Sequence, residues 1–144
     1  MLKACEFMHS HNIVHRDFKP ENMLLSKNGV LKICDFGFAR QLTKANIEEG
    51  VPLTEYVSTR WYRAPELLVG APVYSHAVDV WAIGCIFVEL VTGSAIFAGD
   101  SDFEMLRLII QMFDSSEKLP DRLRQTFARN NLFKNVQLPG GDED

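Results

Sequence analysis

Residues 75–92 constrain the fold most strongly, because this segment is apolar on nearly every side when it is wound into a helix. A helix that is apolar all round has to be buried all round. Its longest apolar stretch, residues 80–91, is interrupted by Glu89 and is well short of the ~20 residues that a membrane span needs. Gly93 suits the C-terminal end of such a helix. The sequence therefore predicts a central, buried helix in a soluble globular domain.

Charge and cysteine content exclude several classes of protein. The chain has 144 residues, enough for one domain, and a formal net charge of −4, which gives no general attraction for nucleic acid or an anionic membrane surface. Its cysteines, Cys5, Cys34 and Cys85, form no CxxC pair, which argues against a disulfide framework or a zinc site. The N-terminal apolar run is too short for a signal peptide. We expect an intracellular protein, in the cytoplasm, the nucleus or both, with neither a nucleic-acid nor a membrane partner.

Two further helices are predicted. Residues 1–10 read as the last turns of a helix, with Cys5 and Met8 near one face. A second helix begins at Ser101, which forms a capping box with Glu104. Residues 41–53, in contrast, are polar and aperiodic, and the chain turns polar again after residue 115. We expect a mobile loop in the first of these segments, and we expect the end of the second, residues 140–144, to be frayed or a truncation point.

The sequence also predicts a β-hairpin. Residues 23–25 and 30–34 are strand-like, and Asn28-Gly29 between them is the strongest short signal for a hairpin turn. If these two residues form the whole turn, Lys27 pairs with Val30, and the same register continued along the strands places Asn22 opposite Asp35. The hairpin would then bring two oxygen-bearing side chains together at one end.

Three short motifs occur in order along the chain: HRDFKPEN at residues 15–22, DFG at residues 35–37 and APE at residues 64–66. One such motif means little alone, but all three in this order form a strong signal. They resemble the catalytic loop, the magnesium-binding triplet and the end of the activation segment of protein kinases. The resemblance implies a mainly α fold with a short β-hairpin. It covers residues 1–144 as a partial kinase domain, namely the C-terminal lobe without the small lobe and the last helices.

The resemblance implies roles for four residues. Phosphoryl transfer depends mainly on positioning and charge neutralisation. Asp17 is expected to accept the hydroxyl proton of a protein substrate, and Lys19 to bring positive charge to the γ-phosphate of ATP. Asn22 and Asp35 offer oxygen ligands of the kind that Mg²⁺ prefers. The implied substrates are proteins phosphorylated on Ser or Thr, because Lys at position 19 marks the serine/threonine branch of the family.

The segment around Thr54-Glu55-Tyr56 narrows the resemblance. It is similar to the Thr-x-Tyr lip of mitogen-activated protein kinases, whereas residues 15–22 and 38–40 are closer to the cyclin-dependent-kinase-like family, which also carries Thr-x-Tyr. Thr54 and Tyr56 are expected to be phosphorylated by an upstream activating kinase; the alternative is that both are unmodified loop residues. Four arginines would be available to bind the phosphates: Arg16, Arg40, Arg60 and Arg63.

Further roles follow from the resemblance. Arg63 is expected to bind a backbone carbonyl near the substrate pocket, which favours proline after the phosphorylated residue. Thr59 would contact Asp17 and Lys19. Asp79, near the start of the central helix, is expected to accept backbone hydrogen bonds from the catalytic loop, since a buried, unpaired carboxylate would be costly.

The remaining polar residues of interest receive structural interpretations. His15 is expected to orient the catalytic loop. Cys34 is interpreted as a small buried hydrophobe, with a reactive thiol as the alternative. His9 and His11 together with His15 are not expected to bind a metal, because a flexible helix end gives poor geometry and there is no fourth ligand.

Two hypotheses about activity stay open. The nine glycines never form GxGxxG, and no Val-Ala-x-Lys strand occurs, although kinase chemistry uses both. The chain is thus either part of an active serine/threonine kinase or a non-catalytic, kinase-derived binding module. The intact Asp17, Lys19, Asn22 and Asp35 favour the first hypothesis. Apolar surfaces that would face the rest of a kinase domain are expected to be exposed in this chain.

The 144-residue chain on its own is expected to transfer negligible phosphate to a Ser-Pro peptide. In the kinases that it resembles, ATP lies between two lobes, and this chain supplies residues for one of them. A radiolabelled-phosphate assay with Mg-ATP measures this. Detectable transfer that disappears on Asp17→Ala would contradict the prediction.

Overall fold

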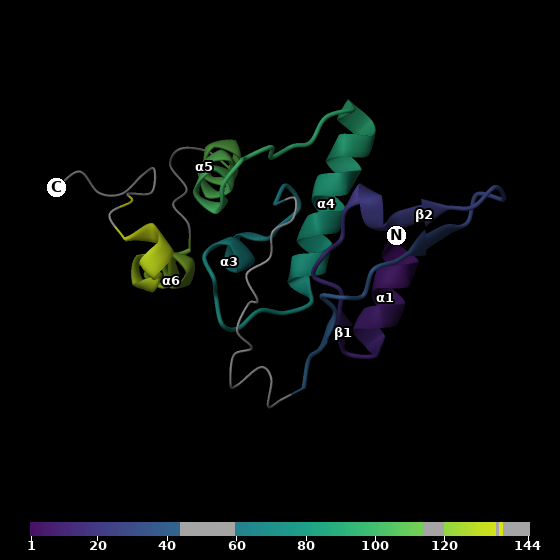
Figure 1. Cartoon of the computed structure of the whole chain (residues 1–144), viewed down its shortest axis with the longest axis horizontal. Helices are drawn as coiled ribbons and strands as arrows, with labels where there is room; N and C mark the ends of the chain where they lie inside the picture. The colour runs from purple at the N-terminus through teal and green to yellow at the C-terminus, as the bar shows by residue number, and fades with distance from the viewer. Residues whose placement is uncertain (44–59, 114–119, 135, 137–144) are drawn as a thin grey trace.

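The computed structural model describes residues 1–43, 60–113, 120–134 and 136. The α-helices are α1 (Leu2–Ser10), α3 (Pro65–Leu68), α4 (Ala77–Thr92), α5 (Asp102–Met112) and α6 (Asp121–Arg129), and the 3₁₀ helices are η1 (Pro20–Asn22) and η2 (Asn131–Phe133). The strands form two antiparallel pairs, β1 (Ile13–Val14) with β4 (Arg40–Gln41) and β2 (Met23–Leu25) with β3 (Leu31–Ile33). The predicted fold class, mainly α with a short β-hairpin, is confirmed (Figure 1).

Helix α4 runs through the middle of the fold. In Figure 1, α1 and the hairpin lie on one side of it, and α3, α5 and α6 lie on the other. One hydrophobic core takes buried side chains from several of these elements, including Cys5 of α1, Ile86 of α4, Leu106 of α5 and Phe127 of α6. Among the described residues, no helix is long and apolar enough to span a membrane.

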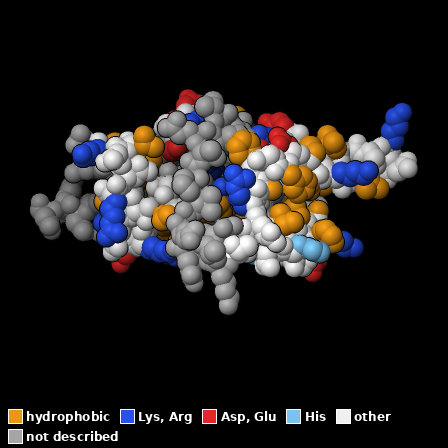
Figure 2. Space-filling model, turned by 60° about the horizontal axis from the view of Figure 1, so that its bottom comes forward, with side chains coloured by type: hydrophobic (Ala, Val, Ile, Leu, Met, Phe, Trp, Pro, Cys, Tyr) orange, Lys and Arg blue, Asp and Glu red, His pale blue; other side chains and the backbone are white. Residues whose placement is uncertain are grey.

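The prediction that α4 is buried on every side is wrong. Its end is as expected, since Gly93 adopts a φ of 80° and donates its N–H to Glu89 O at 2.8 Å. One side of the helix is buried, but Val80, Phe87, Leu90 and Val91 leave 58% to 71% of their surface exposed. The apolar pattern required neighbours all round, and the described residues supply them on one side only. The expected exposure of apolar surface is therefore observed, and Figure 2 shows exposed hydrophobic side chains gathered on the side that carries α1 and the hairpin.

Glu89 shows how a charged residue is accommodated in this apolar helix. Tyr62 donates its hydroxyl hydrogen to Glu89 Oε2 at 2.7 Å. Burial, followed by the hydrogen bond to this carboxylate, raises the pKa of Tyr62. The carboxylate thus fastens α4 to the segment before α3.

The hairpin is confirmed, but its predicted register is wrong by one residue. Met23 pairs with Ile33, so the loop contains residues 27–29 rather than two residues. Gly29 has a φ of 75° and donates its N–H to Ser26 O at 3.0 Å. This is the three-residue hairpin loop, in which a turn is followed by a residue in the left-handed conformation. Asn-Gly thus predicted the correct place for the turn but not its length.

The register change moves the end of the hairpin. Cys34 donates its N–H to Asn22 O at 3.0 Å, so Asn22 lies opposite Cys34 and not opposite Asp35. Asp35 follows one position later, still at the same end of the hairpin. Asn22 and Asp35 therefore lie at the same end of the hairpin, one position out of register with each other. They are not a cross-strand pair.

The predicted start of α5 is confirmed with one difference. Ser101 Oγ accepts the N–H of Glu104 at 3.1 Å, as in a capping box. The Glu104 carboxylate, however, accepts the N–H of Asp100 at 3.0 Å instead of that of Ser101. The cap still satisfies two backbone donors, one in the first turn of the helix and one before it.

Several described elements were not predicted, and β4 and α6 are the two that lie where a loop or a polar chain end was expected. β4 begins at Arg40 and ends at Gln41, the first residue of the expected loop, whose residues 44–53 lie outside the described residues. Helix α6 lies in the polar region after residue 115, where no helix was predicted, and it is held by Phe127, whose ring stacks on Phe133 at 4.4 Å between centroids. Two buried aromatic residues therefore order a segment of polar composition. The predicted frayed end, residues 140–144, lies outside the described residues.

The two sides of α4 are expected to respond differently to truncation. Ile86→Ala removes a side chain that is 2% exposed and should lower the free energy of unfolding by about 2–5 kcal/mol. Leu90→Ala, its control on the side that is 71% exposed, should change it by about 0.5 kcal/mol or less. Urea denaturation measures both. Equal losses in the two variants would show that both sides of the helix are buried in solution.

Candidate active site

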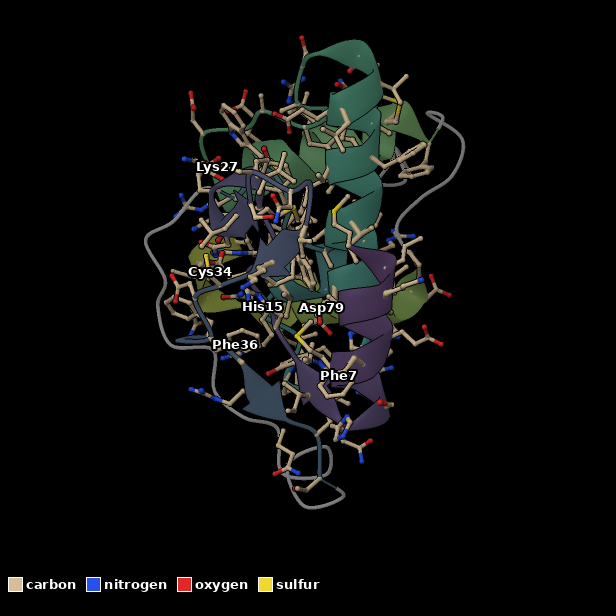
Figure 3. All side chains as sticks on the ribbon, turned by 90° about the vertical axis from the view of Figure 1, so that its right-hand side faces the viewer. Phe7, His15, Lys27, Cys34, Phe36 and Asp79 are labelled. Atoms are coloured by element: carbon tan, nitrogen blue, oxygen red, sulfur yellow. The ribbon has the colours of Figure 1, made fainter. Side chains whose placement is uncertain are left out.

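The catalytic loop is anchored to α4 by one carboxylate. Asp79 is fully buried, and its Oδ2 and Oδ1 accept the N–H groups of His15 and Arg16, each at 2.8 Å. Arg16 has a φ of 67°, which is rare for a residue with a side chain. The two hydrogen bonds hold this turn in place, as expected from the sequence. Figure 3 shows Asp79 and His15 close together where the loop meets α1 and α4.

His15 connects the loop to the end of β3. Its Nε2 lies 3.2 Å from Cys34 O, and its Nδ1 accepts the N–H of Asp17 at 3.3 Å. Because a carbonyl can only accept, these partners assign the ring hydrogen to Nε2. The ring also packs against Phe18 and Phe36, with centroids 4.9 and 5.0 Å away. His15 therefore orients the loop, and Cys34 is partly exposed rather than buried.

The structure brings together the two predicted catalytic residues, Asp17 and Lys19, and one of the two predicted metal ligands, Asn22. The Asp17 side chain is 6% exposed. Asn22 donates through Nδ2 to Asp17 Oδ2 at 2.8 Å and to Asp17 O at 2.9 Å. Lys19 Nζ lies 3.1 Å from the same carboxylate oxygen. A nearly buried carboxylate is thus held between an amide and an ammonium group.

Asp35 lies where β3 has ended. Its side chain is exposed, its φ is 62°, and its Oδ1 accepts the N–H of Gly37 at 3.2 Å. A Cβ at position 37 would lie 3.1 Å from this oxygen, so a side chain there would crowd the carboxylate. Glycine at position 37 therefore leaves room for the carboxylate of Asp35.

The donor set suits a hard cation. Both side-chain hydrogen bonds described for Asn22 use Nδ2, which turns its amide oxygen away from Asp17. The exposed carboxylate of Asp35 lies at the same end of the hairpin. Carboxylate and amide oxygens are the protein ligands that Mg²⁺ accepts, so these two residues fit such an ion.

The arginines that the sequence singled out have partners within the described residues. Arg16 donates through Nε to Phe38 O at 2.6 Å and through Nη1 to the Tyr74 hydroxyl at 2.9 Å. Its guanidinium carbon also lies 5.7 Å from the centre of the Tyr74 ring. Arg40 donates through Nη1 to Ala39 O at 3.0 Å.

Arg60 and Arg63 meet at Asp102, in the first turn of α5. Arg60 Nε lies 2.7 Å and Arg63 Nη1 3.5 Å from the same oxygen, Asp102 Oδ1. Sequence reasoning missed Asp102, because an acidic residue in the first turn of a helix has a sufficient local explanation. Thr54, Tyr56 and Thr59 lie outside the described residues, so their predicted roles stay predictions.

Comparison with known proteins gives the class. Residues 1–135 match the protein kinase domain family, and the chain belongs to that family. It is 53% identical over 139 residues to cyclin-dependent kinase-like 2 of rabbit (Oryctolagus cuniculus) and 50% identical over 138 residues to cyclin-dependent kinase-like 4 of mouse (Mus musculus). Mouse cyclin-dependent kinase-like 5 is 46% identical over 139 residues. The predicted resemblance to cyclin-dependent-kinase-like kinases is thereby confirmed.

Each alignment covers nearly all of this chain but only a minor part of the relative. Each covers 96% of this chain but only 23% of the rabbit protein and 38% and 14% of the two mouse proteins. The chain therefore spans less than two fifths of the length of these relatives.

The anchoring role of Asp79 can be tested by hydrogen exchange. Asp79→Ala leaves two backbone N–H groups without their acceptor, at about 1–3 kcal/mol each. The amides of His15 and Arg16 should then exchange much faster in NMR experiments. Asp121→Ala, which removes an exposed carboxylate, is the control. Unchanged exchange at both amides in Asp79→Ala would contradict the anchoring role.

Proposed function

We propose that the protein containing this chain is a serine/threonine kinase, which transfers the γ-phosphate of ATP to Ser or Thr residues of protein substrates. The observation that carries this proposal is the Asp17 carboxylate, 6% exposed and held by Asn22 and Lys19. A carboxylate that is fixed and nearly dry is suited to accept a hydrogen bond from a substrate hydroxyl. The hydroxyl proton would move to Asp17 as the oxygen attacks phosphorus.

Lys19 has two tasks in this proposal. Its ammonium group lies 3.1 Å from Asp17 Oδ2 and helps to fix the carboxylate. The same positive charge is close to the place where the phosphoryl group meets the hydroxyl, and it favours the negative charge that spreads over the phosphoryl oxygens.

Asn22 and Asp35 would hold Mg²⁺ together with ATP. When bound, the metal ion neutralises phosphate charge. The residues themselves supply oxygen ligands from two places that the hairpin brings together: the end of η1 and the position after β3. His15 connects these two places, because its ring accepts the N–H of Asp17 in the catalytic loop and donates to the carbonyl of Cys34, the residue before Asp35.

Specificity and regulation rest on the motifs. Lys19 supports specificity for Ser or Thr, and Arg63 supports a preference for proline after the phosphorylated residue. Thr54 and Tyr56 are the proposed phosphorylation sites for an activating kinase. A protein that acts on such substrates would work inside the cell, in the cytoplasm, the nucleus or both.

The proposal is tested on the full-length protein that contains this chain. Asp17→Asn keeps the size and hydrogen-bonding capacity of the side chain but removes the base, so kcat for a Ser-Pro peptide should fall by about 10²- to 10⁴-fold. Asp121→Asn, the same change at an exposed position, should leave kcat unchanged. A Ser-Ala peptide should be a poorer substrate than Ser-Pro. Full activity in Asp17→Asn would overturn the proposed mechanism.

A further inference from the structure

Three side chains of different chemistry meet between α1 and α4. They are Cys5 and His9 of α1 and Asp79 of α4, and one ligand atom from each lies within 4.8 Å of the other two. Cys5 and Asp79 are buried, and His9 is partly buried. A thiol, an imidazole and a carboxylate are the three kinds of group that bind Zn²⁺ in proteins.

Two of the three separations are close to those of a zinc site, and the ligand atoms of Cys5 and Asp79 lie within 4.8 Å of each other. Cys5 Sγ lies 3.4 Å from His9 Nε2, and His9 Nε2 lies 2.9 Å from Asp79 Oδ2. With Zn–S near 2.3 Å and Zn–N near 2.0 Å, tetrahedral geometry puts two such ligand atoms roughly 3.5 Å apart. The first separation already has this value, and the second needs to open by about half an ångström.

A fourth group lies beside the cluster. The ring of His76 is 4.6 Å from the ring of His9, centre to centre. Its Nε2 is buried and has no hydrogen-bond partner among the described residues. Hydrogen bonding accounts for Asp79 and His9, but it leaves the buried nitrogen of His76 unexplained.

We propose that Cys5, His9 and Asp79 bind a zinc ion, and that His76, which lies outside the group of ligand atoms within 4.8 Å of one another, turns its ring to become the fourth ligand. On binding, the Cys5 thiol loses its proton to solvent, and His9 carries its ring hydrogen on Nδ1 so that Nε2 can bind the metal. Asp79 binds through Oδ2, whose other lone pair still accepts the N–H of His15, while its Oδ1 accepts the N–H of Arg16. The ion ties α1 to α4 through the carboxylate that anchors the catalytic loop.

The site differs from the proposed magnesium site in its residues and in its chemistry. Asn22 and Asp35 offer oxygen ligands only, whereas this cluster offers sulfur and nitrogen, which Zn²⁺ accepts and Mg²⁺ does not favour. The inference does not depend on the proposed kinase activity. Zinc binding and phosphoryl transfer can therefore be tested separately.

The sequence argued against a zinc site, and the reason is clear from the structure. Cys5 and His9 are one helical turn apart, but the other two ligands come from residues 76 and 79, beyond the reach of any local spacing rule. Of the three histidines considered from the sequence, only His9 belongs to the cluster. The Nε2 of His15 donates to Cys34 O. His11 is exposed, and its Nδ1 lies 2.8 Å from Phe7 O.

The test uses the whole 144-residue chain, freed of metal with a chelator and then loaded with Co²⁺ or Zn²⁺. Co²⁺ should give a thiolate-to-cobalt charge-transfer band, and Zn²⁺ should raise the melting temperature. Both effects should be lost in Cys5→Ser and weakened in His76→Ala. Cys85→Ser is the matched control, because Cys85 is equally buried and burial raises the pKa of both thiols to about 11. It should keep both effects.

Several results would overturn the proposal. These are the absence of a cobalt–thiolate band in the wild-type chain, a band that survives Cys5→Ser, and stabilisation by Mg²⁺ equal to that by Zn²⁺. If Cys5→Ser fails to fold, X-ray absorption of the zinc-loaded wild-type chain decides instead. One sulfur ligand near 2.3 Å supports the site, and a shell of oxygen and nitrogen alone refutes it.

Discussion

The hydrogen bonds of the buried Asp79 carboxylate hold the catalytic loop to α4. A charge in this position is costly unless donors surround it. The N–H groups of His15 and Arg16 are two of those donors, and His9 Nε2, 2.9 Å away, is the third group in contact. The dependence is mutual, because the loop also needs an acceptor for two N–H groups in a turn with a left-handed residue. Through His15 and Cys34 O, the same chain of contacts reaches the residue before Asp35.

Local signals predicted most of the secondary structure. The hairpin strands, the end of α4 at Gly93 and the start of α5 at Ser101 each depend on residues within a few positions of one another. The hairpin register could not be predicted, because Asn28-Gly29 fits a loop of two or three residues. The burial of α4 and the presence of α6 could not be predicted either, since both depend on contacts between distant parts of the chain.

The candidate site likewise combines contacts between residues close in sequence with contacts between distant residues. Asp17, Lys19 and Asn22 lie within six residues, and one loop with a 3₁₀ turn is enough to bring them together. Arg60 with Asp102 and His9 with His76 are separated by tens of residues, and only the packed helices place them in contact. Motif spacing therefore predicts which residues of one loop lie together, but it does not predict the contacts between distant residues.

The left-handed backbone at Arg16 and Asp35 affects which substitutions evolution would accept at these two positions. Their φ values of 67° and 62° disfavour any residue with a Cβ, by roughly 1 kcal/mol or more relative to glycine. Glycine at either position would relax the backbone while removing a side chain that the site uses. Stability and activity thus oppose each other at these two positions. A lineage released from selection for catalysis would be free to drift toward glycine there, and a lineage still under that selection would keep the strained residues.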